Sequence, residues 1–563
     1  MPPKRIAVIG AGAAGLAQAK QILDAFTSPA GLLQVELVIY EARNDVGGVW
    51  LEDPDAGPYR VNANASTNTL RIVPAEPGQL MAYRGSPFDD SIPLFPRAHH
   101  VQDYLRSYAS SHHLRPFIRF QTTVTRVYKR GASWIIESRH NGSADADAGA
   151  DEVRVEAYDF CSVTNGHYEK ASIPDIPGLA GFSGKIMHSR WYRRPDDFIG
   201  KNVLVVGSFA SGSDIARELA SVNLPSDVLP ESMTAHKPPR PADDDDDDED
   251  VPATPHTRIR PTTPRASRLG VYQSSSQTPN MFTPGLSADD AGADDARPWL
   301  RLIEQRPLIE RIETDHRTPS VIRFNDGSTL RDIDVIIFAT GYLYYYPFFK
   351  RSDPPWNTPE AQVLDTPIGE EDVVDKGQND IGGIQGLGMR HMDELMLFLE
   401  TDRSMAMIGL PYQVVPFPLF EIQSHLVALL WAGRLPHFPD HPTLPSRSPA
   451  TEPLPTPPET PRESTTPDVP DTESTDDAHP TRKAATAAAA TAAPEPEPAV
   501  KRYTEKVRGD YVFGFPYEFA YENYLLSLTA EADGGTAGGW GQVEAFRWEY
   551  RRQKELRFQT IGY

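Results

Sequence analysis

The chain has 563 residues, which is enough for two or more domains with substantial hydrophobic cores. Its formal net charge of −23 argues against a nucleic-acid-binding protein, because phosphate contacts require clustered Lys and Arg. The single cysteine, Cys161, excludes an internal disulfide, a CxxC redox pair and a cysteine-rich metal site, so we expect a reducing compartment and no metal.

The first predicted elements are a strand over residues 5–9 and a helix that follows a glycine-rich turn. Gly10 permits the tight turn, Gly12 lets backbone N–H groups approach a pyrophosphate, and Gly15 lets the helix pack closely on the strand. The N-terminus of this helix would face the phosphates with its partial positive charge. The segment therefore predicts a dinucleotide-binding site.

A second predicted strand over residues 35–40 ends in Glu41. A carboxylate at this position accepts a hydrogen bond from a ribose 2′-hydroxyl and repels a 2′-phosphate. The first site therefore suits FAD or NAD better than NADP.

Another strand–turn–helix unit follows at residues 202–220, with Gly207 and Gly212 in its turn. Phe209 replaces the central glycine of the pattern, so this turn alone is a weaker signal than the first. The segment that would carry the strand-end acid, residues 233–237, ends in a histidine and a lysine instead. Positive charge there favours a 2′-phosphate and therefore NADPH, although the sequence does not fix where the strand ends.

Two segments differ from everything around them. Residues 238–297 contain an acidic run from Asp243 to Asp250, and residues 441–500 are rich in Pro, Thr and Glu. Both have too few large apolar side chains to offset the entropy of ordering, so we predict that both are disordered and dispensable for catalysis. Elsewhere, short apolar runs precede glycine-rich turns and helix-like segments, which is typical of a parallel, doubly wound α/β sheet.

Residues 182–192 match the FxGxxxHxxx(Y/F) fingerprint of the flavin-containing monooxygenases at every fixed position. The chain resembles this family in that motif and in further segments that occur in the same order. They are residues 44–50 (GGxW), 67–68 (Thr-Asn), 165–168 (Gly-His), 338–342 (FATGY) and 409–434 (Pro-Phe, Gln, Gly-Arg). The resemblance covers most of residues 4–237 and 298–440, and residues 501–563 more loosely.

The resemblance implies an α/β fold with two Rossmann-like, doubly wound dinucleotide-binding domains, the NADPH domain being inserted in the FAD domain. Residues 1–180 would begin the FAD domain, and residues 181–345 would form the NADPH domain and the return to the FAD domain. Residues 346–440 would complete the FAD domain, 441–500 would be a linker, and 501–563 would add a C-terminal segment to the core.

The resemblance also implies a cycle in which NADPH reduces FAD and the reduced flavin captures O2 as a C4a-hydroperoxide. This species would oxygenate a nitrogen or sulfur atom of a small-molecule substrate, so the protein's task is to hold the cofactors and exclude water. The implied catalytic residue is Asn68, whose amide would hydrogen-bond the hydroperoxide. The implied FAD-binding residues are Gly10, Gly12, Ala14, Gly15, Glu41, Gly48, Val49, Trp50, Thr67 and Asn68. The implied NADPH-binding residues are Gly207, Ser211, Gly212, Ser213 and Asp214.

Three further residues receive an interpretation. We expect His188 to link the domains rather than to act as an acid or base, Arg190 could reach a 2′-phosphate, and Cys161 is expected to pack in a buried strand.

Two alternatives stay open and one is excluded. A Baeyer–Villiger monooxygenase is disfavoured because its related fingerprint carries Trp-Pro where this chain has Tyr192 and Arg193. A flavin-binding protein without enzyme activity would explain Phe209 and the acidic segment. A pyridine-nucleotide disulfide reductase needs a cysteine pair, which one cysteine excludes.

We expect a cytoplasmic protein without a membrane span. The first predicted strand begins at Arg5, which leaves no room for a signal peptide before it. The most apolar late stretch, residues 405–431, contains three prolines, a glutamate and a histidine, and therefore falls short of a spanning helix. The expected partners are a small nucleophilic substrate and O2, without nucleic acid, and a homo-oligomer is compatible with the sequence.

Overall fold

The structure is a computed structural model that describes the chain in separate stretches. These are residues 3–27, 31, 33–51, 80–92, 96, 98–141, 153–224, 269–276, 298–315, 318–358, 384–445, 508–533 and 540–552. The chain divides into two compact units, one of Met1–Pro445 with Thr504–Tyr563 and one of Ser446–Tyr503. The second unit lies outside the described residues, so the fold below is that of the first.

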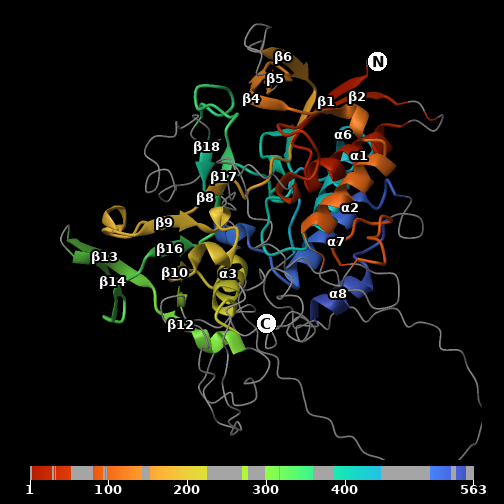
Figure 1. Cartoon of the computed structure of the whole chain (residues 1–563). Coiled ribbons are helices and arrows are strands. Elements are labelled where there is room, and N and C mark those ends of the chain that lie inside the picture. The colour runs from red at the N-terminus through yellow and green to blue at the C-terminus, as the bar shows by residue number, and fades with distance from the viewer. Residues whose placement is uncertain are drawn as a thin grey trace, which may run out of the picture. The chain divides into compact units, whose positions relative to one another are not determined.

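A six-stranded sheet contains the N-terminal strands in the order β19-β20-β7-β1-β2-β3, and Figure 1 labels its strands β1 and β2. Its strands are β1 (Lys4–Ile9), β2 (Val35–Tyr40), β3 (Ile118–Arg119), β7 (Phe160–Val163), β19 (Phe398–Leu399) and β20 (Asp402–Met407). All neighbours are parallel except β19, which is antiparallel to β20. The strands β1 and β2 are apolar and buried over most of their length, as expected for the centre of a parallel sheet.

Helices from both ends of the chain share one hydrophobic core with this sheet. They are α1 (Ala13–Phe26), α2 (Ala98–Ser111), α6 (Pro416–Trp431), α7 (Tyr517–Thr529) and α8 (Ala545–Arg552). Leu16 of α1, Leu426 of α6 and Phe519 of α7 are all fully buried in this core. The C-terminal stretch therefore belongs to the same packed body as the first strand.

A second sheet has five parallel strands in the order β12-β11-β10-β16-β9. They are β9 (Lys185–His188), β10 (Asn202–Val206), β11 (Gly270–Ser274), β12 (Ile303–Arg306) and β16 (Val335–Phe338). Helix α3 (Ala210–Ser221) follows β10 and is labelled beside it in Figure 1. It buries Ile215 and Leu219 in a core that it shares with this sheet. Every strand of the second sheet lies between β7 and β19 in the sequence, which confirms the predicted arrangement of one doubly wound unit inserted in another.

Three smaller antiparallel sheets complete the described fold. The first has β4 (Thr122–Arg130), β5 (Ser133–His140) and β6 (Arg154–Tyr158), and the second has β13 (Ile309–Asp315), β14 (Thr318–Phe324) and β15 (Thr329–Leu330). The third has β8 (Lys170–Ala171), β17 (Tyr342–Tyr346) and β18 (Ile384–Gly386). The chain leaves the six-stranded sheet through β8 and returns through β17, and these two strands pair with each other.

The prediction that residues 238–297 are disordered throughout is wrong for residues 269–276. They contain β11 (Gly270–Ser274), which lies between β10 and β12 and buries Val271, Gln273 and Ser274. A five-residue strand surrounded by polar sequence gives too short a signal to be recognised, and its neighbours in the sheet stabilise it. Likewise, residues 441–445 belong to the core rather than to the linker, since Leu444 packs on the main cluster. The remainder of both segments lies outside the described residues.

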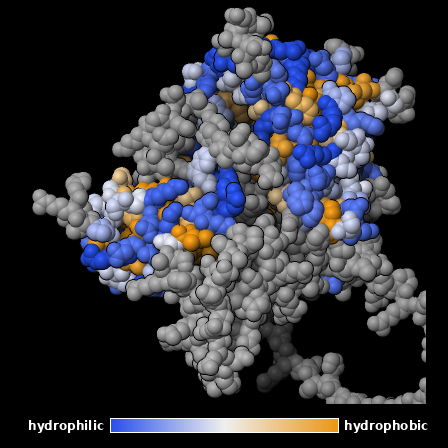
Figure 2. Space-filling view, viewed as in Figure 1, coloured by the Kyte–Doolittle hydropathy of each residue, from blue (hydrophilic) through white to orange (hydrophobic). Residues whose placement is uncertain are grey.

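The surface of the described residues that faces the viewer in Figure 2 is mostly hydrophilic, with apolar residues in small patches. Within the described stretches, no helix combines the length and the apolar character that crossing a membrane requires.

Candidate functional site

The first glycine-rich turn connects β1 to α1 at the C-terminal edge of the six-stranded sheet. Gly10 has a φ of 104°, and its N–H donates to the carbonyl of Tyr40 at the end of β2 over 2.8 Å. A Cβ on Gly10 would lie 2.8 Å from the carbonyl oxygen of Thr164, and one on Gly15 would lie 1.9 Å from the carbonyl oxygen of Gly10. The protein itself therefore requires glycine at both positions.

Gly12 differs from the other two glycines of this turn. A Cβ there would make only ordinary contact, 3.5 Å from the Cα of Gly48. Gly12 and Gly48 thus face each other backbone to backbone, and the N–H of Gly47 donates to the carbonyl of Ala11 over 3.0 Å. The described residues leave room beside Gly12, which suits a pyrophosphate, since this group approaches backbone N–H groups at this position of the pattern.

Glu41 stands at the end of β2, beside the same turn. Its buried carboxylate accepts hydrogen bonds from the N–H of Ala11 (2.7 Å) and from the N–H of Arg43 (2.9 Å). Burial raises the pKa of this carboxyl, and the two backbone donors and the charge of Arg43 oppose the rise. The structure therefore places the strand-end acid at the turn, where a ribose hydroxyl next to a bound pyrophosphate would be in reach.

The remaining residues of the predicted FAD site that the structure describes surround this turn. Ala14 and Trp50 are buried in the main core, and Val49 is half-buried beside it. Thr67 and Asn68 lie outside the described residues, so their roles stay predictions.

Two residues that hold the Gly47–Gly48 turn were not found from the sequence. The side chain of Arg43 donates to the carbonyls of Gly48 (2.7 Å) and Leu51 (2.6 Å). The amide of Gln102, on α2, donates to the carbonyl of Val46 over 2.7 Å. Arg43 follows the strand-end acid by two residues, but no sequence pattern connects Gln102 with the turn.

The second turn, between β10 and α3, repeats the geometry of the first. Gly207 has a φ of 114°, and a Cβ on it would lie 2.5 Å from the carbonyl oxygen of Ala339. A Cβ on Gly212 would lie 2.2 Å from the carbonyl oxygen of Gly207. Phe209 occupies the position before the helix and is 41% exposed, and its carbonyl accepts from the N–H of Ser213 over 2.9 Å. The phenylalanine therefore replaces a glycine without disturbing the start of α3.

The other predicted NADPH-binding residues lie in the first turns of α3. The hydroxyl of Ser213 donates to the carbonyl of Ser208 over 2.8 Å, and Ser211 is half-buried. Asp214 is buried and forms an ion pair with Arg217 at 3.0 Å. That pair shows how the helix accommodates the Asp214 carboxylate, and direct contact of Asp214 with NADPH stays a prediction.

Among the described residues, the strand that follows α3 and pairs with β10 is β11, so the interpretation that the corresponding strand ends at residues 233–237 is wrong. His236 and Lys237 lie outside the described residues, and the strand ends at Ser274 instead. The carbonyl of Ser274 accepts from the N–H of Gly207 over 2.8 Å, which places the end of β11 beside the second turn. Ser275 follows there, and its N–H donates to the carbonyl of Arg306 over 3.0 Å.

The end of β11 therefore has hydroxyl side chains rather than an acid. A 2′-phosphate would meet no carboxylate from this strand end, as NADPH requires. Ser274 and Ser275 were missed in the sequence because β11 itself was assigned to the polar segment.

His188, at the end of β9, links the fingerprint to the FATGY segment. Its Nδ1 accepts from the N–H of Arg190 at 3.2 Å, so its Nε2 carries the proton and donates to the carbonyl of Gly341 at 2.9 Å. Burial and the charge of Arg190 lower the pKa of His188 to about 3. A neutral, fully buried imidazole agrees with the linking role expected from the sequence. Arg190 is itself buried, with its guanidinium over the ring of Trp191 at 4.6 Å.

Aromatic residues line the part of the sheet edge that follows β7 and β20. The ring of His167 lies 4.7 Å from the ring of Tyr412 and 5.4 Å from that of Tyr344. Asn165 donates from Nδ2 to the carbonyl of Tyr345 over 3.0 Å. These segments and the first turn share one edge, because the carboxyl ends of β20, β7, β1 and β2 all lie there. Tyr344 and Tyr412 were not singled out from the sequence.

The comparisons with known proteins agree with this geometry. The family model described as "Flavin-binding monooxygenase-like" matches residues 3–229 and 306–358. The flavin-containing monooxygenase FMO GS-OX-like 7 of Arabidopsis thaliana is 29% identical over 448 residues, which cover 76% of this chain and 74% of the plant protein. Dimethylaniline monooxygenase [N-oxide-forming] 2 of Pan troglodytes is 29% identical over 369 residues, which cover 62% of this chain and 63% of that protein.

A solved structure supports the fold. The S-allyl-L-cysteine S-oxygenase of Allium sativum superposes with a TM-score of 0.58 at 18% identity, covering 99% of this chain and 93% of the other. The family match includes both glycine-rich turns and the fingerprint around His188. The chain thus belongs to the flavin-binding monooxygenase-like family, a family of FAD- and NADPH-dependent oxidoreductases.

Proposed function

We propose that this protein is a monooxygenase that uses NADPH and O2 to oxygenate a nitrogen or sulfur atom of a small molecule. The observation that carries the proposal is the pair of strand–turn–helix units with sterically required glycines, one at the C-terminal edge of each of the two large sheets. Two such turns suit two dinucleotides, one resident and one that brings the reducing equivalents.

The first turn would hold FAD. The backbone around Gly12 and Gly48 would take the pyrophosphate, and Glu41 would take the adenosine ribose. Bound FAD supplies the chemistry, since it accepts hydride from NADPH and activates O2. Thr67 and Asn68 are proposed as contacts of the flavin from the family motif alone.

The second turn would hold NADPH. Gly207 and Gly212 shape the turn, α3 directs its N-terminus toward the phosphates, and the hydroxyl-bearing end of β11 would lie nearest the adenosine ribose. His188 contributes no proton transfer in this scheme, because its two ring nitrogens are engaged by backbone groups.

The substrate class rests on the chemistry of relatives. One relative is named as an N-oxide-forming dimethylaniline monooxygenase, and the structural neighbour is named as an S-oxygenase. Both reactions oxygenate a soft nucleophilic atom, so we infer the same class for this protein. A cytoplasmic location is proposed on the sequence alone.

The test compares two alanine variants of the first turn. Wild-type protein is expected to purify with FAD, to lose its flavin absorbance on anaerobic addition of NADPH, and to form an N-oxide or sulfoxide in air. Gly12→Ala is expected to fold and to lose FAD, because its methyl fits the protein but enters the space proposed for the pyrophosphate. Gly15→Ala is the matched control that damages the fold itself, since its methyl overlaps the carbonyl of Gly10.

Different failures have different meanings. Full flavin retention in a folded Gly12→Ala variant would overturn the assignment of the first turn. Flavin that NADPH does not reduce would favour a binding protein without this activity. Lactone or ester formed from a ketone, with no product from amines or sulfides, would replace the proposed reaction with a Baeyer–Villiger oxygenation.

A further inference from the structure

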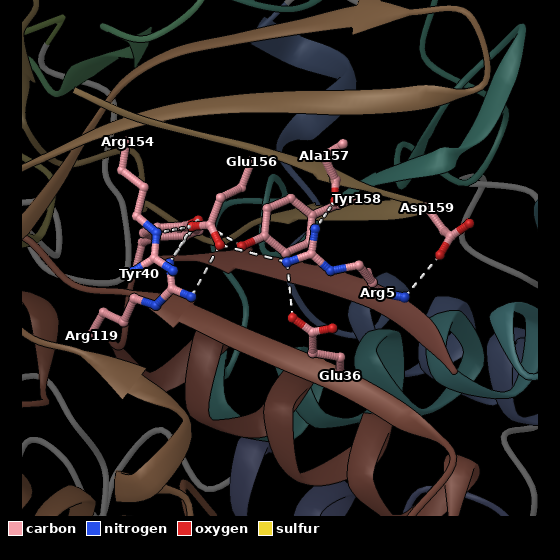
Figure 3. Close-up of polar contacts among 9 residues, drawn as sticks. All are labelled: Arg5, Glu36, Tyr40, Arg119, Arg154, Glu156, Ala157, Tyr158 and Asp159. Atoms are coloured by element: carbon pink, nitrogen blue, oxygen red, sulfur yellow. Dashed lines mark hydrogen bonds and ion pairs between the residues drawn. The ribbon is translucent and has the colours of Figure 1, made fainter. Parts of the chain in front are cut away.

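A cluster of charged and aromatic side chains joins β6 to the ends of β2 and β3 (Figure 3). We name it the Glu156 cluster, and its members are Arg5, Tyr40, Arg119, Arg154, Glu156 and Tyr158. Arg5 and Tyr40 lie in the two strands of the first nucleotide site, but none of the six was predicted to bind a cofactor. The cluster nevertheless adjoins the first site, because Tyr40 immediately precedes Glu41.

Glu156 is the centre of this cluster. Its carboxylate is only 11% exposed and accepts a hydrogen bond from the hydroxyl of Tyr40 over 2.9 Å. It forms a close ion pair with Arg119 and a second with the Nε of Arg154 at 3.2 Å. Burial alone would raise the pKa of Glu156, but the donors Arg119 and Tyr40 and the charge of Arg154 hold it below its usual value. The carboxylate is therefore charged and fixed in place at neutral pH.

The two main partners of Glu156 are also the backbone neighbours of Glu41. Tyr40 and Arg119 lie opposite each other where β2 pairs with β3. The carbonyl of Arg119 accepts from the N–H of Glu41 over 3.1 Å, and the N–H of Thr122 donates to the carbonyl of Glu41 over 2.8 Å. The guanidinium of Arg119 also lies over the ring of Tyr40, 5.5 Å from its centre. The carboxylate of Glu156 thus holds both Tyr40, which precedes Glu41 in the sequence, and Arg119, whose carbonyl accepts from the N–H of Glu41.

We propose that Glu156 is a positioning residue for the adenosine end of FAD, acting by fixing Tyr40, which precedes Glu41, and Arg119, which accepts from the N–H of Glu41. This inference rests on the proposed binding of FAD at Glu41. The reason is geometric, because a carboxylate that must bond a ribose hydroxyl and the Ala11 N–H together tolerates only small displacements. Glu156 touches no cofactor atom in this scheme and acts only through Tyr40 and Arg119.

The test is the affinity of apoprotein for FAD in Glu156→Gln, measured by quenching of flavin fluorescence. The amide keeps the size of the side chain but loses the charge that holds Arg119, and we expect the Kd for FAD to rise about tenfold. Glu36→Gln is the matched control, since Glu36 is another acid near the cluster that is 50% exposed. It pairs with Arg5, which also contacts Glu156, but not with Tyr40 or Arg119. Its Kd is expected to equal that of wild type.

Two further measurements separate positioning from general loss of structure. ADP competes for the adenosine half of the site alone, so its inhibition constant against FAD should rise by the same factor in Glu156→Gln. The KM for NADPH at saturating FAD should stay as in wild type, because the second turn lies in a different sheet. Tyr40→Phe keeps the ring and removes one hydrogen bond to Glu156, and it should weaken FAD binding less than Glu156→Gln does.

The outcomes distinguish this inference from the function on which it rests. Unchanged FAD affinity in Glu156→Gln, or weaker FAD binding with unchanged ADP competition, would overturn the positioning role while FAD binding stands. An equal loss of FAD affinity in Glu36→Gln would show that the effect comes from surface charge, and this too would overturn the positioning role of Glu156. Wild-type apoprotein that does not bind FAD would overturn the proposed function itself.

Discussion

Replacing His188 by Gln should remove a specific acid sensitivity from the protein. His188 is fully buried, and burial together with the charge of Arg190 lowers its pKa to about 3. In the unfolded chain the pKa of a histidine is about 6.5. When the pH is above this value, the imidazole is neutral in both the folded and the unfolded state, and it makes its full contribution to the stability of the fold. As the pH falls below about 6.5, the unfolded chain binds a proton at this histidine and the folded protein does not. The folded protein therefore loses stability progressively until the pH reaches the pKa of His188 in the folded state.

The size of the effect follows from the gap between the two pKa values. A pH of 5 is about 1.5 units below the pKa of the histidine in the unfolded chain, and each unit corresponds to about 1.4 kcal/mol of free energy. The folded group stays neutral there because its pKa is about 3. Between pH 8 and pH 5 this one side chain should therefore cost the folded state about 2 kcal/mol.

The assay is urea unfolding of wild type and of His188→Gln at pH 8 and at pH 5, both at saturating FAD. Glutamine keeps a donor for the carbonyl of Gly341 and does not titrate, while lost ring packing lowers stability equally at both pH values. From pH 8 to pH 5, the free energy of unfolding of wild type should thus fall by about 2 kcal/mol more than that of the variant. Equal losses in the two proteins would refute the argument, because the imidazole would then be as free to protonate in the folded state as in the unfolded one.

The other predictions concern three separate regions of the chain. Burial raises the pKa of Glu421 from 4.5 to about 7, so the folded state keeps a proton that the unfolded chain releases, and the free energy of unfolding falls as the pH rises from about 4.5 to 7. In the same unfolding assay, Glu421→Gln should therefore lose about 2–3 kcal/mol less of this free energy than wild type between pH 5 and pH 8. Deleting residues 238–268 spares β11 and should leave flavin content and NADPH oxidation within a few-fold of wild type, whereas deleting 238–297 removes a central strand and should abolish flavin reduction by NADPH. Asn68→Asp should still oxidise NADPH but release H2O2 in place of product, since a lost hydrogen bond to a charged group costs roughly 1.5–3 kcal/mol; unchanged product yield would assign Asn68 to a local turn.

The parts of the fold that the sequence predicts well are those with local signals. The apolar runs that form β1 and β10 each lead into a glycine turn and a helix, and all of this lies within about two dozen residues. Glu41 could be placed because the strand-end acid follows the first turn at a regular distance. In these segments the chemistry of the ligand and the steric needs of the turn both constrain nearby residues.

The parts that sequence reasoning missed depend on contacts between distant segments. β11 has five residues, and only its place between β10 and β12 makes it a strand. Gln102 reaches the Gly47–Gly48 turn across 56 residues, and Glu156 bonds Tyr40 across 116. Hydrogen bonds between residues so far apart leave no periodic pattern in a single sequence, so they could not be predicted from it.

The insertion of one sheet within the chain of the other has a consequence for synthesis. Strand β7 ends at Val163 and its neighbour β20 begins at Asp402, so 238 residues lie between them. At roughly 5–20 residues per second, a ribosome needs on the order of 10–50 s to make that stretch. Throughout this time the edge of β7 that β20 will cover presents unpaired backbone groups, a known starting point for aggregation. The inserted five-stranded sheet is complete at Phe338, before β20 exists, so the nascent protein must keep an open edge on its first sheet while its second sheet is already able to fold.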